Sequence, residues 1–468
     1  MRVLVAEILQ RADVVPPALV DRIVATADGN PYYVEELVKW LVEERVLDIS
    51  ADGWVISDRA VDTLRIPTTL RGLLQARLDS LEVPERGVVG GAAVVGRVFW
   101  DEAVARLAPM VPDQDRVLER LTSREVVFPR PHSSFSGCRE FSFRHALMRD
   151  VAYEGVLRSV RRAHHALAAQ WLEEVVERSQ RPDEHAAAVA HHHEEAGNAD
   201  IAARWYFRAG RHAARTFAGD DALRLFARAS ALVPPQERTL WIDVQLAREA
   251  VLDRLARRAE QRAVLDELGA ATDLDRERRA MLALAEGRWL FYRGDYPAVA
   301  PVAEEAERLA REAGRGDLES DAQMQGGRSR AYLNEHAGAR ELLNRSLATA
   351  RTIGDHRRAG EALRLLGIVA TNQGKSDEAL ALLDAARAEH RLIEDPEGEA
   401  LVNGQVGAML THVGRLEEAR TVSEAALRYW QATGHRYREG VMLTNLARLA
   451  MDQGRLDDAL EGACGRCV

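Results

Sequence analysis

The second half of the chain carries a pattern of small residues that repeats every 40 positions. One series consists of Ala259, Val299, Ala339, Ala379, Ala419 and Ala459, and a second series in the same phase of Ala247, Gly287, Gly327, Gly367, Gly407 and Ala447. Turn residues precede most members of the first series by five positions, at Gly294, Asn334, Gly374, Gly414 and Gly454. A period of this length is typical of stacked helical hairpins, which bury their apolar stripes only against neighbours. The pattern therefore predicts a binding surface rather than a catalytic pocket.

One hairpin before this series fits the tetratricopeptide pattern, in the segment "WYFRAGRHAARTFAGDDALRLFARASALVP". Gly210 takes the small site on the first helix, Ala222, Phe226 and Ala229 take the packing sites on the second, and Pro234 closes the hairpin. Six in-phase units follow, which predicts seven hairpins. Each unit is longer than the usual period of about 34 residues, and we attribute the extra length to longer helix ends and inter-repeat turns. Only nine residues follow Ala459, so we expect the last repeat to be truncated or completed by another chain.

The first 160 residues have a different pattern. Helices are predicted at 16–28, from Pro31 onward, from Pro67 and Thr68 onward, and from Pro84 to Gly96. Pro31 suits the first position of a helix, where its missing N–H costs nothing. Residues 46–57 alternate around "ADG", which predicts a small hairpin. Two further helices, 100–108 and 114–123, precede the strands "REVVFPR" and "REFSFR", and another helix begins near His145. Helices followed by a two-stranded wing are typical of a winged helix.

The predicted fold is therefore all-α: an α-solenoid of tetratricopeptide-like helical hairpins, preceded by a small winged-helix domain and a short β-hairpin. The net charge of −10 argues against a nucleic-acid surface. Three cysteines, Cys138, Cys464 and Cys467, form no disulfide framework. No signal peptide opens the chain, and the longest apolar run, 88–96, is too short to span a bilayer. We expect a cytoplasmic protein.

Five segments in order resemble the C-terminal part of STAND ATPases, the signal-transduction ATPases with numerous domains. They are "ADGNPYYVEELVKWLVEERVL", "IPTTLRGLLQARLDSL", "GGAAVVGRVFW", "FSFRHALMRDVAYEGVL" and "HHALAAQWLEE". The nearest type is the bacterial regulator whose AAA-type ATPase module is fused to tetratricopeptide repeats, with relatives that carry adenylate cyclase or LuxR-type domains. The resemblance implies a helical lid remnant at 1–66, a winged helix at 67–158, connecting helices at 159–198 and the solenoid at 199–468.

The same resemblance implies two nucleotide-sensing residues. The family's counterpart of Pro31 packs near the adenine, and its counterpart of His145, here in the setting Phe143, Arg144, His145 and Arg149, reaches the phosphates of ADP. An imidazole can donate to phosphate oxygens. The residues alone also allow a plainer interpretation, in which Pro31 only starts a helix and His145 only caps one.

The chain departs from the family in lacking a P-loop, which requires G-x-x-x-x-G-K-[ST]. Of its two lysines, Lys39 lies within a predicted helix, and Lys375 stands in "GKS" where Val369 replaces the first glycine. That tripeptide falls in a predicted inter-helix turn, and no Walker B pattern precedes residue 16. We therefore predict no enzyme activity and no cofactor, with ADP or ATP bound only if a separate P-loop partner is supplied.

Other candidate chemistry is weak. His191, His192 and His193 are adjacent and point to different helix faces, whereas metal ligands on a helix prefer the i, i+4 spacing, so no metal is predicted. Cys464 and Cys467 form a single C-x-x-C near the end of the chain. The candidate recognition helix at 113–127 mixes acidic and basic residues, which does not favour DNA binding.

These observations predict a non-catalytic regulatory fragment of a STAND ATPase that binds partner proteins through its solenoid. An alternative is one half of a split ATP-binding or adenylate-cyclase-type regulator, completed by a separate P-loop protein. A weaker alternative is a winged-helix transcriptional regulator. Neither a membrane nor a nucleic acid is the expected partner, and the sequence leaves oligomerisation open.

Overall fold

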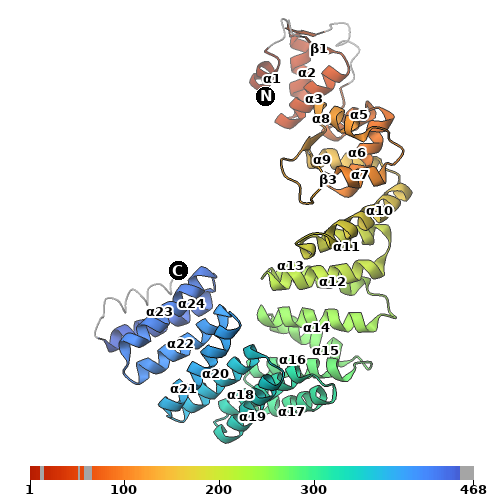
Figure 1. The fold of residues 1–468 in the computed structure, drawn as a ribbon. Helices are drawn as coiled ribbons and strands as arrows, with labels where there is room; N and C mark the ends of the chain where they lie inside the picture. The colour runs from red at the N-terminus through yellow and green to blue at the C-terminus, as the bar shows by residue number, and fades with distance from the viewer. Residues whose placement is uncertain (11–14, 51–52, 57–65, 454–468) are drawn as a thin grey trace. The chain divides into compact units, whose positions relative to one another are not determined.

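The computed structural model describes residues 1–10, 15–50, 53–56 and 66–453. The chain divides into two compact units, Met1–Pro234 and Pro235–Val468, and helices dominate both (Figure 1). The predicted all-α solenoid is confirmed. None of the helices in the described ranges combines the length and the apolar character that a membrane span requires.

The first unit opens with three helices and a hairpin. They are α1 (Arg2–Ile8), α2 (Pro17–Ala27), α3 (Pro31–Glu43), β1 (Leu47–Ser50) and β2 (Gly53–Ile56). The strands pair antiparallel with Leu47 opposite Ile56, which confirms the predicted hairpin. Helix α3 begins at Pro31 as predicted, because the Asn30 side chain accepts hydrogen bonds from the next two free backbone N–H groups. Its apolar stripe, including Leu37 and Leu41, is buried.

A second group of elements surrounds a three-stranded sheet. They are α5 (Leu70–Asp79), α6 (Val83–Val95), β3 (Val98–Trp100), α7 (Asp101–Leu107), α8 (Gln114–Ser123), β4 (Val127–Pro129), β5 (Glu140–Phe143) and α9 (Ala146–Gly155). The helix predicted from Pro67 begins later, after its cap Thr69. Strand β3 was not predicted, and it pairs antiparallel with β5, so the sheet order is β3-β5-β4. Phe99, Phe141 and Phe143 form its buried aromatic centre.

Helical hairpins complete the first unit. They are α10 (Arg158–Glu177), the 3-10 turn η1 (Pro182–His185), α11 (Ala186–Ala196), α12 (Ala199–Arg215) and α13 (Gly219–Leu232). Helices α12 and α13 form the predicted tetratricopeptide-like hairpin. A Cβ at Gly210 would lie 2.5 Å from the Phe226 ring, and Ala222, Phe226 and Ala229 are buried.

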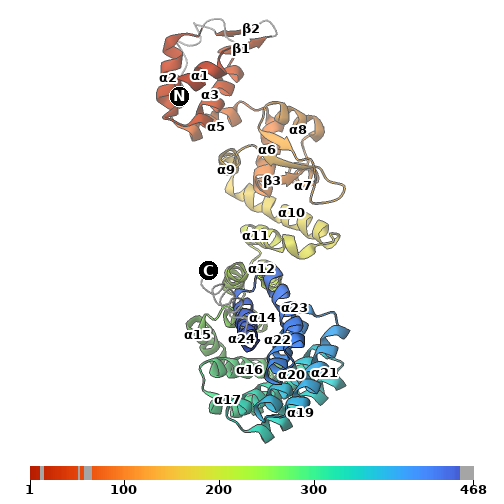
Figure 2. The same ribbon diagram turned by 90° about the vertical axis from the view of Figure 1, so that its left-hand side faces the viewer.

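The second unit is a regular stack of hairpins (Figure 2). Its helices are α14 (Arg238–Arg254), α15 (Arg258–Gly269), α16 (Arg276–Tyr292), α17 (Tyr296–Glu312), α18 (Gly316–Tyr332), α19 (His336–Thr352), α20 (His356–Asn372), α21 (Ser376–Leu392), α22 (Pro396–His412), α23 (Leu416–Ala432) and α24 (Arg436–Asp452). From α16 onward every helix has 17 residues and every turn has three. The extra length of the repeat thus lies in the helices, and the predicted lengthening of the inter-repeat turns is wrong.

The series of small residues explains how the two helices of a hairpin approach each other. A Cβ at Gly327, Gly367 or Gly407 would lie within 3 Å of the side chain that faces it from the second helix, respectively Leu343, Leu383 and Ser423. Ala339, Ala379 and Ala419 are fully buried on those second helices. For these three hairpins the predicted role of the small residues is confirmed.

The first hairpin of the unit departs from the 40-residue phase. Helices α14 and α15 begin 38 residues before α16 and α17, so the buried packing sites hold Glu249 and Gln261. Ala247 is half-buried and Ala259 is exposed, and their predicted packing role is wrong. The polar pair is satisfied internally, because the Gln261 amide donates to Glu249 Oε1 at 2.8 Å.

Two glycine substitutions in the first helices should have opposite effects on stability. In Gly367→Ala the new Cβ would lie 2.9 Å from Leu383 Cγ, and overpacking of this kind costs on the order of 1–3 kcal/mol, more than the gain in helix propensity. Gly440→Ala on α24 meets nothing within 4 Å and should stabilise by about 0.5–1 kcal/mol. Urea denaturation followed by circular dichroism measures both. Equal effects would contradict the packing role of Gly367.

Candidate functional site

The two residues singled out by the family resemblance, Pro31 and His145, lie at one junction of the first unit. Pro31 is the first residue of α3, and the ring of the next residue, Tyr32, lies 3.8 Å from the His145 ring, centroid to centroid. His145 is the N-cap position of α9, but its side chain makes no capping hydrogen bond. Its Nε2 atom is buried without a partner, and burial lowers the pKa of the imidazole.

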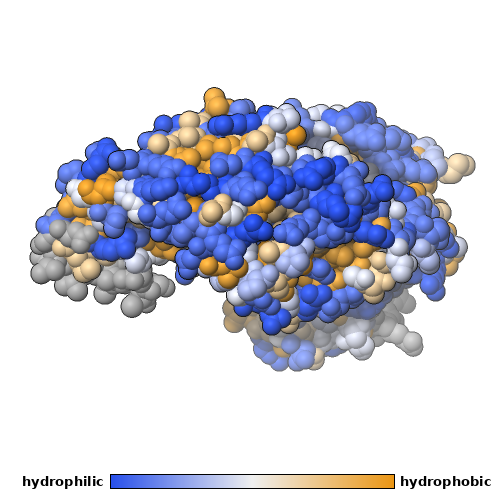
Figure 3. Space-filling model, turned by 90° about the horizontal axis from the view of Figure 1, so that it is seen from below, coloured by the Kyte–Doolittle hydropathy of each residue, from blue (hydrophilic) through white to orange (hydrophobic). Residues whose placement is uncertain are grey.

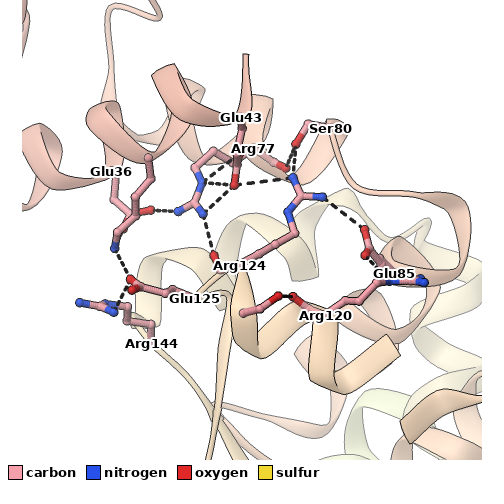
Figure 4. Close-up of polar contacts among 11 residues, drawn as sticks. Glu36, Glu43, Arg77, Ser80, Glu85, Arg120, Arg124, Glu125 and Arg144 are labelled. Carbon is pink, nitrogen blue, oxygen red and sulfur yellow. Dashed lines mark hydrogen bonds and ion pairs between the residues drawn. The ribbon is translucent and has the colours of Figure 1, made fainter. Parts of the chain in front are cut away.

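Next to this contact a network of buried charges joins α3 to α5 and to the end of α8 (Figure 4). The Arg77 guanidinium, on α5, bonds Glu36 and also donates to Glu43 Oε1 at 2.9 Å and to the Arg124 carbonyl at 3.0 Å. Arg77 and Glu36 are only 3% and 1% exposed. Arg124 in turn pairs with the buried Glu85 of α6.

A second branch of the network runs toward His145. Lys39 lies 3.0 Å from Glu36 and 2.8 Å from Glu125, and Arg144 lies 2.5 Å from the same Glu125 carboxylate. Each cation of the network thus has at least one carboxylate partner, and each carboxylate at least one cation. The junction of α3 with the sheet-containing part of the unit is closed by groups of the protein itself.

This arrangement does not fit a nucleotide phosphate. A phosphate site needs free backbone N–H groups or unpaired cations, and Lys39, Arg77 and Arg144 are engaged with carboxylates. The free nitrogen of His145 is buried beside the Tyr32 ring. The nucleotide-sensing role that the resemblance implies for Pro31 and His145 stays a prediction.

The network should make the stability of the first unit depend on pH. The Lys39 ammonium, hydrogen-bonded to Glu125, holds the pKa of this carboxyl below its ordinary value, and Arg144 adds to the effect. A carboxyl with a lowered folded-state pKa contributes stability above its unfolded pKa, about 4.3, and loses it as the pH falls through the folded value. Glu125→Gln should therefore flatten the loss of stability below about pH 4.5 in urea titrations. Glu119→Gln, an exposed carboxylate outside the network, should leave the slope unchanged.

A second candidate site is a groove on the first helices of the hairpins in the second unit. These helices lie against one another in sequence: α16 with α18, α18 with α20, α20 with α22, and α22 with α24. A groove of about 300 Å³ crosses the first three of them. It is lined by Leu284, Arg288, Phe291 and Tyr292 of α16, Asp321, Met324, Gln325 and Arg328 of α18, and Glu361 and Leu365 of α20.

Aromatic side chains gather at one end of this groove, in a chain with only 6% aromatic residues. Phe291 and Tyr332 lie 5.0 Å apart between ring centroids, Tyr296 and Tyr332 lie 4.8 Å apart, and Tyr292 lies 6.0 Å from Phe291. Tyr292 and Tyr332 are more than half exposed. The guanidinium of Arg328 lies 3.9 Å from the Phe291 ring centroid. This Arg and aromatic composition is typical of residues that dominate protein interfaces.

The charges in the groove are not equally engaged. Arg288 pairs with Glu249 at 2.9 Å, Asp321 with Arg358 at 2.8 Å, and Glu361 with Arg364 at 2.7 Å. Across the described part of the chain no carboxylate forms an ion pair with Arg328. Burial opposes the ionisation of Glu361, but Arg364, and at longer range Arg328, hold its pKa below the ordinary value.

Much of the surface is strongly polar. The face in Figure 3 is mostly hydrophilic, with apolar patches between the charged areas. On the second helices, ion pairs such as Arg308 with Glu305, at 2.6 Å, are solvent-exposed. Arg328, which lies on an aromatic cluster without an ion-pair partner among the described residues, thus differs from the ion-paired Arg308 on the second helix α17.

Two of the three adjacent histidines contact other side chains of the fold. His192 is buried with its Nδ1 atom 2.8 Å from His165 Nδ1, and His193 lies 2.9 Å from Glu173. Among the described residues no group of histidine, cysteine or acidic side chains is arranged to hold a metal ion. Lys375 lies in the turn between α20 and α21, as predicted. Cys464 and Cys467 fall outside the described residues.

No protein-family model matches the chain, and no curated protein matches it. A solved STAND protein with a tetratricopeptide repeat sensor, from Pyrococcus horikoshii, is similar over 99% of this chain and 71% of its own, with 11% identity and a TM-score of 0.45. Aspartyl phosphate phosphatase F from Bacillus subtilis is similar over 82% of this chain and 94% of its own, with 10% identity and a TM-score of 0.50. At this identity the second likeness is one of fold, that of a helical repeat protein.

Proposed function

We propose that this chain is a non-catalytic regulatory protein that binds a segment of a partner protein along the first helices of its repeats. The observation that carries the proposal is the groove on α16, α18 and α20, where Phe291, Tyr292 and Tyr332 gather beside Arg328. Tyrosine, tryptophan and arginine are enriched among the few residues that supply most of the binding energy in protein interfaces. A repeat stack is suited to this use because its neighbouring first helices form one continuous surface.

We further propose the domain assignment that the family resemblance implies: a lid remnant at 1–66, a winged helix at 67–158, connecting helices at 159–198 and the repeats at 199–468. Support for the winged helix comes from the order α6, β3, α7, α8, β4, β5 and from the sheet order β3-β5-β4. In this proposal the chain is a cytoplasmic regulator of the STAND type without its own nucleotide site. Measurable ATP hydrolysis by the purified chain would contradict it.

Site-specific photocrosslinking in cells tests the binding surface. A benzoylphenylalanine at Tyr332, which is 56% exposed beside the groove, is expected to form a covalent adduct with a partner polypeptide. The same residue placed at Arg308, exposed on α17, is the matched control and should form none. Adducts of equal yield at both positions, or at neither, would overturn the proposed use of the groove.

A further inference from the structure

Gln325 occupies an unusual position at the centre of the groove. Its amide nitrogen donates to the Leu284 carbonyl of the preceding first helix at 3.0 Å, while its Oε1 atom is buried without a hydrogen-bond partner. The side chain lies across Gly287 of α16, where a Cβ would come within 2.4 Å of Gln325 Oε1. Gly287 therefore makes room for the amide of the next repeat, whereas the sequence pattern had predicted a contact within its own hairpin.

Arg328 lies one helical turn further along α18, on the same groove. Its guanidinium carbon lies 3.9 Å from the Phe291 ring centroid, within the range of a cation–π contact. Because the other charged residues of the groove are paired, a carboxylate is the ligand group that complements the remaining charge.

We infer that the groove binds an extended peptide with an acidic side chain, whose carboxylate pairs with Arg328. This inference rests on the proposed function and specifies its ligand. Arg328 is on the middle of three helices, with Phe291 and Tyr292 on one side and Leu365 on the other. A peptide that crosses all three helices therefore extends on both sides of the carboxylate, which favours an internal aspartate or glutamate, flanked by apolar residues, over a chain terminus.

The test uses the full chain and a phage-displayed library of random ten-residue peptides. Wild-type protein should enrich peptides with an acidic residue at a fixed position beside apolar or aromatic residues. Arg328→Met, which removes the guanidinium and keeps an unbranched side chain, should lose this enrichment, and Arg308→Met at an exposed position of α17 should keep it. Thermal unfolding by circular dichroism confirms that each variant is folded.

Affinities of one selected peptide, measured by fluorescence anisotropy, then locate the contact. Asp→Asn or Glu→Gln in the peptide should weaken binding roughly ten- to hundredfold, and Arg328→Met should remove this difference between the two peptides. Enriched peptides without an acidic position, bound equally by Arg328→Met, would overturn the inference and leave the proposed function standing. No enrichment on the wild-type chain would overturn both.

Discussion

Replacement of Arg77 by leucine is expected to lower the free energy of unfolding of the first unit by about 3–5 kcal/mol, because removal of one partner leaves buried charge uncompensated. The Glu36 side chain, which is 1% exposed, would lose its guanidinium partner. Glu43 would lose its hydrogen bond from the same guanidinium. The Arg124 carbonyl would also lose its donor. Urea denaturation of the full chain, followed by tryptophan fluorescence and circular dichroism, measures the change.

Arg71→Leu provides a matched control on the same helix. Arg71 pairs with Glu154 across the surface, and both side chains are more than half exposed, so we expect a loss of at most about 1 kcal/mol. A second replacement, Glu36→Leu in the Arg77→Leu background, should recover part of the loss. Similar costs for Arg77→Leu and Arg71→Leu would mean that the buried network does not hold α3 in place.

The second large effect is expected at the polar pair of the first hairpin in the second unit. Glu249→Ala removes the shorter hydrogen bonds of the Gln261 amide and the Arg288 guanidinium and leaves their longer contacts with Asp253. The loss of hydrogen bonds to a buried carboxylate costs about 2–3 kcal/mol. The double variant Glu249→Ala, Gln261→Ala resembles the small pairs of the later hairpins. It should cost less than the sum of the two single changes, because the double variant removes both partners of this hydrogen bond, whereas each single variant leaves one buried partner behind.

Glu304→Ala is the control for this prediction. Glu304 pairs with Arg330 at 3.2 Å and is 64% exposed, so its removal should change stability by less than about 1 kcal/mol. Strictly additive effects of Glu249→Ala and Gln261→Ala would show that the two side chains are not coupled, contrary to the hydrogen bond between them.

The repeat architecture was predictable because identical helix and turn lengths place chemically equivalent residues at a constant interval. The phase of the first hairpin was not predictable. In an alanine-rich chain, Ala247 and Ala259 fit the 40-residue series by composition alone, while the packing sites hold Glu249 and Gln261. An apolar pattern cannot reveal a buried polar pair, since its burial depends on a hydrogen bond between two helices. Strand β3 escaped prediction for a related reason: three residues between helices carry no periodicity.

For the candidate sites too, the sequence indicated some residues and missed the contacts between distant parts of the chain. Sequence resemblance pointed to Pro31 and His145, and the structure places them at one junction through Tyr32. The pairing of Glu36 with Arg77, 41 positions later, has no local signal. The groove was missed, although a signal existed: "WLFYRGDY" at 289–296 concentrates aromatic residues in a chain that has few. One repeat away on the adjacent first helix stands Arg328, which only the stacking of α16 and α18 brings onto Phe291.

The glycine at 287 differs from those at 327 and 367 in what a methyl group would displace. At 327 and 367 the obstacle is the branched centre of a leucine, whereas at 287 it is the movable end of Gln325. A saturation mutagenesis experiment that scores cellular abundance separately from partner capture should therefore split this column of glycines. Alanine at 327 and 367 should reduce abundance, and alanine at 287 should leave abundance near normal while capture falls. Glycines at equivalent repeat positions would then be under two different kinds of selection, for stability at 327 and 367 and for partner binding at 287.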